Sequence, residues 1–486
     1  MKPILLTLFL LLFFVSAAGA QQSDDLRYYD IGSPTLTDVY VDPVNGDDAN
    51  TGDSAETALR TIAEAWQRIP MGVELATGYH FHVAAGRYSA DMLPNYWESR
   101  YGTFEHPILF SGAGAETTQI ATVNLFDARY VYFMDMRIAE GIDAFHCERC
   151  DHVLLRGMTF VGADPDTYQT QETVKFNQST HIYIEDSDIS GAWDNALDFV
   201  AVQHGHVIGS TIHNAGDWCA YAKGGSAYIT YERNEFYDCG TGGFSAGQGT
   251  GFQYMVPPFL TYEAYYIRFV NNVVHDTDGA GAGVQGGYNV LIAHNTFTRI
   301  GARSHMFEAV FGGRSCDGGA DDPSRVLCTE YAAAGGWGND LIGDGENFVR
   351  IPNRHVFVYN NVFYNPDGYQ SQWSHFTIFA PFGAPVPVLA DDDLRIVGNV
   401  IWNGGADHPL GLGDGAGCAA DNPTCNEMQL LRDNAINTLR PDAATFAVAG
   451  YAPVPLPAFV ADDLTVPPPD QLETVSSWDG VGADVR

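Results

Sequence analysis

Short apolar strands return along this chain at a nearly constant interval. Segments such as HIYIEDSDI, AYITYERNEF and NVLIAHNTF alternate apolar and polar residues, as strands with one buried face do. Aligned on the residue two before the last apolar position, the repeats place in one column Met136, Met158, Ser187, Ser210, Asn234, Asn272, Asn295, Asn361 and Asn399. Successive intervals are 22, 29, 23, 24, 38, 23, 66 and 38 residues. A base interval of 22–24 residues with insertions predicts a solenoid.

The units lack helical periodicity, which excludes the helical repeats, and each has too few strands for a propeller blade. The all-β alternative is a parallel β-helix, in which each strand lies over its counterpart one coil before, about 4.8 Å away. The aligned asparagines then form a ladder at one turn of the coil. We expect that ladder to be structural.

The regular part of the chain is expected over residues 80–405, with insertions at 247–263 and 301–352. Residues 21–79 form a leader and an N-terminal cap, in which Leu59, Ile62, Ala63 and Trp66 have the spacing of an amphipathic helix. Residues 406–486 form an irregular C-terminal capping segment. The long insertions are expected to shape a binding groove along one face.

The first 20 residues have the pattern of a signal peptide: Lys2, an apolar run, and small residues up to Ala20. No later stretch approaches the roughly 20 apolar residues of a membrane span. We therefore expect an exported, secreted or periplasmic protein, and a monomer. Its eight cysteines fit an oxidising compartment, with four local pairs. The predicted pairs are Cys147–Cys150, Cys219–Cys239, Cys316–Cys328 and Cys418–Cys425.

The formal net charge is −36, which excludes nucleic acid as a partner because such binding needs clustered cations. Three explanations of this acidity stay open: a solvating surface suited to salt, calcium sites, and steering of a cationic ligand. Apart from Lys2, the chain has only two lysines, Lys175 and Lys223, and both lie in the central repeats.

The repeat interval predicts which of the central side chains are neighbours. Asp194 and Asp217 are 23 residues apart, and so are Lys175 and Asp198, so each pair should stack one coil apart on a common face. Two stacked carboxylates share a proton or bind a cation, for which calcium is the expected ion in an exported protein. The alternative is that these aspartates bond to turn amides.

The register of Lys223 is ambiguous because its coil is one residue longer. Lys223 aligns with Phe199 or with the neighbour of Phe199, and we expect it to point outward, near Gln248. Lys223 or Lys175 could act as a general base if its pKa is lowered. The alternative for both is ion pairing with the acidic surface.

Other side chains are candidates for catalysis or for sugar binding. His305 is an acid/base candidate, and Arg303 and Arg314 of the 301–352 insertion could contact an anionic substrate. Trp193, Trp218 and Tyr237 could stack on sugar rings, although core packing explains many such aromatic residues.

The segments YVDPVNGDDANTGDSAETALRTIAEAW, GGSAYITYERNEFYDCGTGGFSAGQG and VYNNVFYNP resemble the secreted right-handed parallel β-helix superfamily that includes pectate lyases. The resemblance implies a right-handed coil and polysaccharide as the substrate. Calcium-dependent lyases of this superfamily bind the metal through aspartates on adjacent coils. By resemblance, Asp194, Asp198 and Asp217 would hold Ca²⁺, with Lys223 or Lys175 as the base.

The sequence therefore predicts an exported polysaccharide lyase that acts on uronate-containing glycans with the help of calcium. Its expected catalytic set is Lys223, Lys175, Asp198, His305 and Arg314. A glycoside hydrolase with paired aspartates is the first alternative, although the Asn-Thr-Asp signature of the hydrolases of this fold is absent. A non-catalytic, carbohydrate-binding solenoid is the second.

Overall fold

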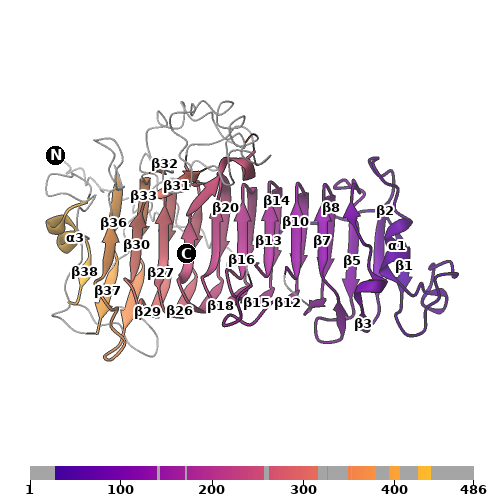
Figure 1. The fold of residues 1–486 in the computed structure, drawn as a ribbon, viewed down its shortest axis with the longest axis horizontal. Helices are drawn as coiled ribbons and strands as arrows, with labels where there is room; N and C mark the ends of the chain where they lie inside the picture. Colours follow the sequence, from indigo (N-terminus) through magenta and orange to yellow (C-terminus); the bar gives the residue numbers. More distant parts are fainter. Residues whose placement is uncertain are drawn as a thin grey trace, which may run out of the picture.

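The structure is a computed structural model, and it describes residues 28–139, 143–169, 172–256, 262–315, 326, 349–351, 353–378, 393–404 and 425–438. Over these residues the chain is a right-handed parallel β-helix. Its strands lie side by side along the long axis, with helix α1 (Ile62–Gln67) at one end and α3 (Glu427–Asp433) at the other (Figure 1). The predicted fold class is confirmed.

Three long parallel sheets wrap the coil. Sheet A has 13 strands: β1 (Leu36–Val41), β2 (Gly78–Val83), β5 (Ile108–Gly112), β8 (Arg129–Met134), β11 (Asp151–Arg156), β14 (Thr180–Glu185), β17 (Gln203–Ile208), β20 (Ser226–Glu232), β24 (Ala264–Tyr265), β25 (Arg268–Val270), β28 (Gly287–Ala293), β33 (Arg354–Tyr359) and β36 (Leu394–Val397). Sheet B has 12 strands: β3 (Gly86–Tyr88), β6 (Thr118–Ile120), β9 (Arg137–Ile138), β12 (Thr159–Val161), β15 (Asp188–Ala192), β18 (Thr211–Ala215), β21 (Glu235–Cys239), β26 (Val273–Thr277), β29 (Thr296–Ile300), β34 (Val362–Asn365), β37 (Val400–Asn403) and β38 (Ala435–Ile436).

Sheet C has 10 strands: β4 (Trp97–Glu98), β7 (Val123–Phe126), β10 (Phe145–Glu148), β13 (Val174–Asn177), β16 (Leu197–Val200), β19 (Trp218–Lys223), β22 (Gly242–Ala246), β27 (Ala280–Gln285), β30 (Phe307–Val310) and β35 (Phe376–Ile378). A small sheet D joins β23 (Gly249–Gly251), β31 (Gly312–Ser315) and β32 (Val349–Ile351) from the two insertions. Short 3-10 helices are η1 (Ala55–Thr57), η2 (Ala90–Met92) and η3 (Phe252–Tyr254). One coil passes through sheets C, A and B in turn, as in β13, β14 and β15.

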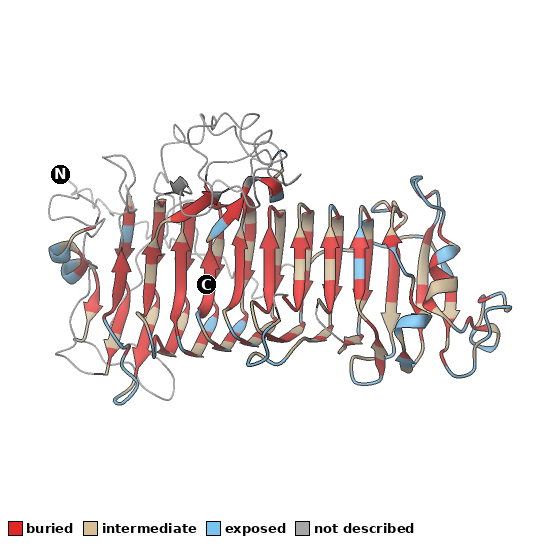
Figure 2. Ribbon diagram, in the orientation of Figure 1, coloured by how far each residue is buried: buried red, intermediate tan, exposed pale blue. Residues whose placement is uncertain are grey.

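The core is one continuous apolar column inside the coil (Figure 2). Inward side chains stack on their counterparts in the next coil; Phe81, Phe110 and Phe133, for example, follow each other at 4.6 and 5.1 Å between ring centroids. Helix α1 closes the column at its N-terminal end, where Ile62 and Trp66 are buried. The regular part of the chain was expected to start at residue 80. Strand β1 already pairs with β2 in sheet A, so the coil begins within the segment predicted as leader and cap.

The predicted asparagine ladder runs along the turn between sheets A and B. Asn234, Asn272, Asn295, Asn361 and Asn399 are buried, and each side-chain oxygen accepts from the backbone N–H of the aligned residue one coil earlier. Each side-chain amide donates both to the carboxamide of the following asparagine and to a strand carbonyl, as Asn295 Nδ2 does to Phe269 O at 2.9 Å. The ladder satisfies buried backbone groups that a turn would otherwise leave unpaired.

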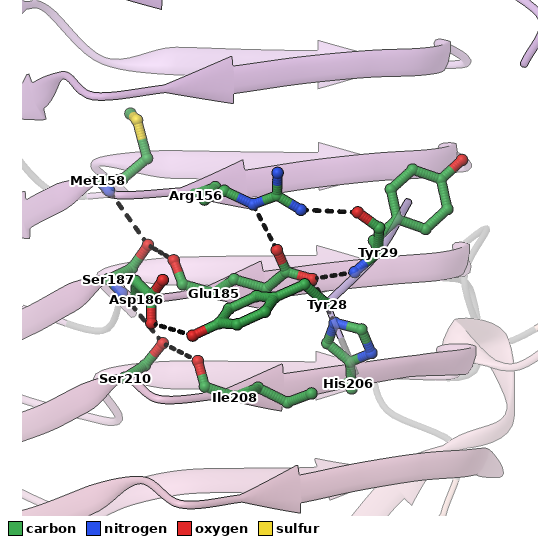
Figure 3. Close-up of polar contacts among 10 residues, drawn as sticks. All are labelled: Tyr28, Tyr29, Arg156, Met158, Glu185, Asp186, Ser187, His206, Ile208 and Ser210. Carbon is green, nitrogen blue, oxygen red and sulfur yellow. Dashed lines mark hydrogen bonds and ion pairs between the residues drawn. The ribbon is translucent and has the colours of Figure 1, made fainter. Parts of the chain in front are cut away.

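The described end of the leader lies across the outer face of sheet A (Figure 3). Tyr29 stacks on Tyr183 at 4.2 Å between ring centroids, and its backbone N–H donates to Glu185 Oε1 at 2.6 Å. Arg156 bridges the two segments, because it donates to Glu185 Oε2 and to the Tyr29 carbonyl. Tyr28 donates to Asp186 at 2.8 Å. The leader is thus held on the coil by ring stacking and by polar contacts that are mostly part-buried.

Two of the predicted disulfides, Cys147–Cys150 and Cys219–Cys239, are present. The pair Cys316–Cys328 and residue Cys418 lie outside the described residues. In the described part of the chain, none of the helices is long and apolar enough to cross a membrane.

Candidate functional site

The two central lysines lie on the outer face of sheet C. Strand pairing places Lys175 of β13 beside Asp198 of β16, and Asp198 beside Tyr221 of β19. The Lys175 Nζ atom is 3.6 Å from Asp198 Oδ2. The 23-residue interval predicted the alignment of Lys175 with Asp198. The same interval leads from Asp198 to Tyr221, which the sequence reasoning missed.

Glu172 completes the inner part of this cluster. It precedes β13, and the Lys175 Nζ atom donates to both of its carboxylate oxygens at 2.9 Å. The Glu172 carboxylate also meets the carboxyl group of Asp198, which is fully buried. The carboxyl groups of Glu172 and Asp198 therefore both lie next to the Lys175 ammonium.

Burial and charge shift the pKa values of these two carboxyl groups in opposite directions. Burial raises the pKa of Asp198 to about 8; the Lys223 ammonium opposes this rise and the Glu172 carboxylate adds to it. Burial would also raise the pKa of Glu172, but the Lys175 ammonium lowers it below its usual value. Asp198 is therefore the neutral acid of the pair at pH 7, and Glu172 is the carboxylate.

Lys175 is held as an ammonium ion. Burial alone would lower its pKa, but the carboxyl groups of Asp198 and Glu172 raise the pKa of Lys175 well above its ordinary value. A lysine held in this state cannot accept a proton near neutral pH. Lys175 therefore supplies a fixed positive charge.

Lys223 lies two coils beyond Lys175 and one coil beyond Asp198, at the end of β19. Its backbone pairs with Val200, the neighbour of Phe199, which settles the register that the spacing left open. The Lys223 Nζ atom points outward and donates to Gln248 Oε1 at 2.9 Å and to the Tyr221 hydroxyl at 2.8 Å. The expected position near Gln248 is confirmed.

Tyr221 separates Lys223 from Asp198. Its ring is buried, with the Lys223 ammonium 4.3 Å from its centroid. Burial raises the pKa of Tyr221 well above its ordinary value, so the phenol stays protonated. Trp218 packs against Tyr221 and over Gly242 and Gly283, where a Cβ atom would meet its ring. Trp218 therefore fixes the tyrosine and is too buried to stack on a sugar.

A groove of about 1190 Å³ adjoins the cluster at the turns between sheets B and C. Asp194 and Asp217 line it one coil apart, and the Asp217 N–H donates to the Asp194 carbonyl at 3.0 Å. Burial raises the pKa of both carboxyl groups. The positive charges of Lys175 and Lys223 partly oppose the rise in the pKa of Asp194, and the charge of Lys223 does the same at Asp217. The groove and the cluster therefore interact electrostatically. The other aspartates along the groove are Asp164, Asp166, Asp238, Asp276 and Asp278.

Trp193 and Arg303 are the predicted substrate-binding residues that lie in this groove. The Trp193 ring packs edge-on against Tyr168, which is exposed, at 4.6 Å between centroids. Arg303 pairs with Asp278 at 2.9 Å and donates to the Gly240 carbonyl at the same distance. The groove thus has an aromatic wall and one cation among many carboxyl groups.

Of the three other candidates, Tyr237 and His305 lie away from the cluster, whereas Arg314 lies near Lys223, because its partner Glu263 accepts from the Gly224 N–H at 2.9 Å. Tyr237 belongs to sheet B, in a ring stack between His213 and His275. His305 lies against Trp373, and burial lowers its pKa to about 4. Arg314 is fully buried on β31, where it pairs with Glu263 and donates to the Tyr262 carbonyl.

The three aspartates expected to hold calcium do not converge on one point. Among the described residues, the groups of three or more ligand-type side chains whose atoms lie within 4.8 Å of one another do not include Asp194, Asp198 or Asp217. Asp198 is instead engaged with Glu172 and Lys175, so an ammonium ion already supplies the positive charge there. These residues do not fit a calcium site formed by all three aspartates.

Comparison with known proteins agrees with the architecture. Residues 140–319 match the family model described as a right-handed β-helix region. Comparison with curated protein sequences gives no match.

The chain is similar to several solved structures. A rhamnogalacturonan lyase is 10% identical, over 75% of this chain and 87% of that one, with a TM-score of 0.44. The pectate lyase Pel9A is 13% identical, over 82% and 83%, with a TM-score of 0.35. A lacto-N-biosidase from Eubacterium ramulus is 11% identical, over 56% of this chain, with a TM-score of 0.32, and the chain spans 65% of its length. Identities this low carry no information on activity.

Proposed function

We propose that this chain is an exported polysaccharide lyase that cleaves uronate-containing glycans by β-elimination. The observation that carries the proposal is the cluster on sheet C. Lys175 contacts the buried Asp198 there, and Lys223 lies on the far side of Tyr221, on the outer surface of a strongly acidic coil. A uronate carboxylate would find its complementary charge at this place.

The chemistry needs a positive charge, a base and an acid. A cation next to the uronate carboxylate acidifies the C5 proton, and Lys175 is held as the ammonium ion that provides this charge. The base removes the proton, the electron pair forms the C4–C5 double bond, and the C4–O bond breaks. We assign the role of base to Lys223, which is at the surface of the cluster.

The leaving oxygen must gain a proton. Asp194 and Asp217 border the groove, and burial raises the pKa of both carboxyl groups. Either carboxyl group would then donate to the leaving oxygen. The two carboxyl groups also place less negative charge in the groove when they are protonated, which favours an anionic chain.

Incubation of the protein with a panel of polyuronates tests the proposal, with ultraviolet absorbance as the measure of new unsaturated ends. We expect absorbance to rise with the wild-type protein and not with Lys223→Ala. Absence of unsaturated products across the panel, from a protein shown to be folded, would overturn the proposal.

Glycoside hydrolysis is the second candidate, and the groove favours it. Two stacked carboxyl groups of raised pKa beside an aromatic wall could act as the acid and the base on a neutral sugar. Hydrolysis would release reducing ends without unsaturation, and Asp194→Asn or Asp217→Asn would abolish it while Lys223→Ala would not. A non-catalytic binding protein would give neither product.

A further inference from the structure

A separate cluster of ligand-type side chains lies on the first two strands of sheet A. Asp38 is on β1, and His80 and His82 are two residues apart on β2, so the two histidines share one face of the sheet. Asp38 pairs with His80 in the strand register. Asp38 Oδ1 is 2.7 Å from His82 Nε2 and 3.6 Å from His80 Nδ1.

His80 is oriented from behind by a serine of the next strand. Its Nε2 atom is 3.0 Å from Ser111 Oγ. When Nε2 donates this hydrogen bond, a neutral His80 turns the lone pair of Nδ1 toward the Asp38 carboxylate. A lone pair and a carboxylate oxygen at this separation repel each other unless a cation lies between them. Histidines that bind metals donate their second N–H to an oxygen in the same manner.

We propose that Asp38, His80 and His82 bind a divalent transition-metal ion of the zinc class. Two imidazoles and one carboxylate are ligands that zinc accepts, and bonds of about 2.0–2.1 Å in tetrahedral geometry put ligand atoms roughly 3.4 Å apart. The separation between His80 and Asp38 already fits, and the hydrogen bond between His82 and Asp38 would open by less than about 1 Å.

The fourth position is accessible. A cavity of about 350 Å³ is lined by His80, His82 and Ser111, together with Asp42. Water or a small ligand can complete the coordination from this side. The ion would cross-link the edge strand β1 to β2 and so hold the first coil of the solenoid, independently of the proposed lyase activity.

A second group of ligand-type side chains, Asp151, His152 and His181, differs from the proposed site in the orientation of its histidine rings. The rings of His152 and His181 are stacked at 4.1 Å between centroids and 13° between planes, so their nitrogens point in parallel directions. Both histidines bond directly to Asp151, at 2.7 and 3.2 Å. In contrast, the rings of His80 and His82 are tilted by 40°. The ion pairs of His152 and His181 with Asp151 account for the stacked group. A substitution in that group therefore serves as a matched control for the proposed zinc site.

The test is calorimetric titration of the full chain, treated with a chelator and dialysed, with Zn²⁺ in the presence of millimolar Ca²⁺. Calcium occupies non-specific acidic sites and competes poorly for imidazole nitrogen. We expect one site per chain in the wild type. The affinity should fall more than tenfold in His82→Asn and Asp38→Asn, and about 10- to 100-fold in Ser111→Ala, which removes the partner of His80. His181→Asn should bind as the wild type does.

Replacement of Zn²⁺ by Co²⁺ gives a second readout, because tetrahedral Co²⁺ with nitrogen ligands absorbs visible light. We expect this absorbance in the wild type and in His181→Asn, and its loss in Asp38→Asn. Circular dichroism shows whether each variant is folded, and Asp38 is exposed, so its substitution leaves the core intact. Absence of zinc binding to the wild type, or binding unchanged in folded Asp38→Asn and His82→Asn, would overturn the proposal.

Discussion

The Nζ atom of Lys175 lies 2.9 Å from both carboxylate oxygens of Glu172, so the lysine is held at two points rather than one. Asp198, 3.6 Å from the same nitrogen, is the third member of this group, and its side chain is fully buried. The charge state of each member therefore depends on the other two.

Replacement of Lys175 by methionine should destabilise the protein by about 3 kcal/mol, because it leaves the Glu172 carboxylate buried without its counter-ion. Denaturant unfolding measures the change. Lys175→Arg, which keeps the charge, is the matched control and should cost less. A loss below roughly 1 kcal/mol in the methionine variant would show that the pair contributes little.

Replacement of Lys223 by alanine should reduce activity by at least about 100-fold, the contribution expected from a general base. Its stability should change little, because Lys223 is at the surface of the cluster and, among the described residues, its ammonium group donates to Tyr221 and Gln248. Lys223→Arg keeps the charge but is not a base at neutral pH, so it should be equally inactive. Full activity in the arginine variant would assign Lys223 to charge rather than to proton transfer.

The stability of the folded state should fall as pH rises from about 4 to about 8. Burial raises the pKa of Asp198 to about 8, above its value in the unfolded chain, so the folded state binds a proton that the unfolded state releases. The slope is at most about 1.4 kcal/mol per pH unit for one proton. Unfolding of Asp198→Asn over the same range isolates the effect, since that variant should lack this part of the slope. Parallel profiles for the two proteins would contradict the assignment.

The asparagine ladder should be a main source of stability for the later coils. Asn295→Ala removes the acceptor of the Asn272 N–H and the donor to the Phe269 carbonyl, both buried, and should cost about 3 kcal/mol. Asn95→Ala, at an exposed position, is the control. Equal unfolding midpoints for the two variants would show that the ladder is dispensable.

Chelation of calcium should leave β-elimination intact, because the Lys175 ammonium already provides positive charge at Asp198. Activity measured with and without EGTA checks this expectation. A loss of activity that is restored by added Ca²⁺ would instead support the calcium-dependent mechanism that the resemblance implied. Zinc bound at Asp38, His80 and His82 would not restore it.

The sequence determined the coil because a parallel β-helix repeats its side-chain environment once per turn. The interval of 22–24 residues placed Asn295 over Asn272 and Asp198 over Lys175 without any coordinates, and both alignments are found. The same interval also leads from Asp198 to Tyr221, a neighbour that the sequence analysis did not name. Glu172 left no such signal, because it lies in the turn before β13, outside the repeated strand positions.

Only the tertiary structure decided what these neighbours do. Spacing gives the coil on which a side chain lies, but not whether its charge is enclosed, and burial with a counter-ion is what makes Asp198 an acid and fixes Lys175 as a cation. The position of Lys223 depended on one extra residue, whose location a repeat pattern does not reveal. Strand pairing resolved it by aligning Lys223 with Val200, which turns its side chain outward toward Gln248.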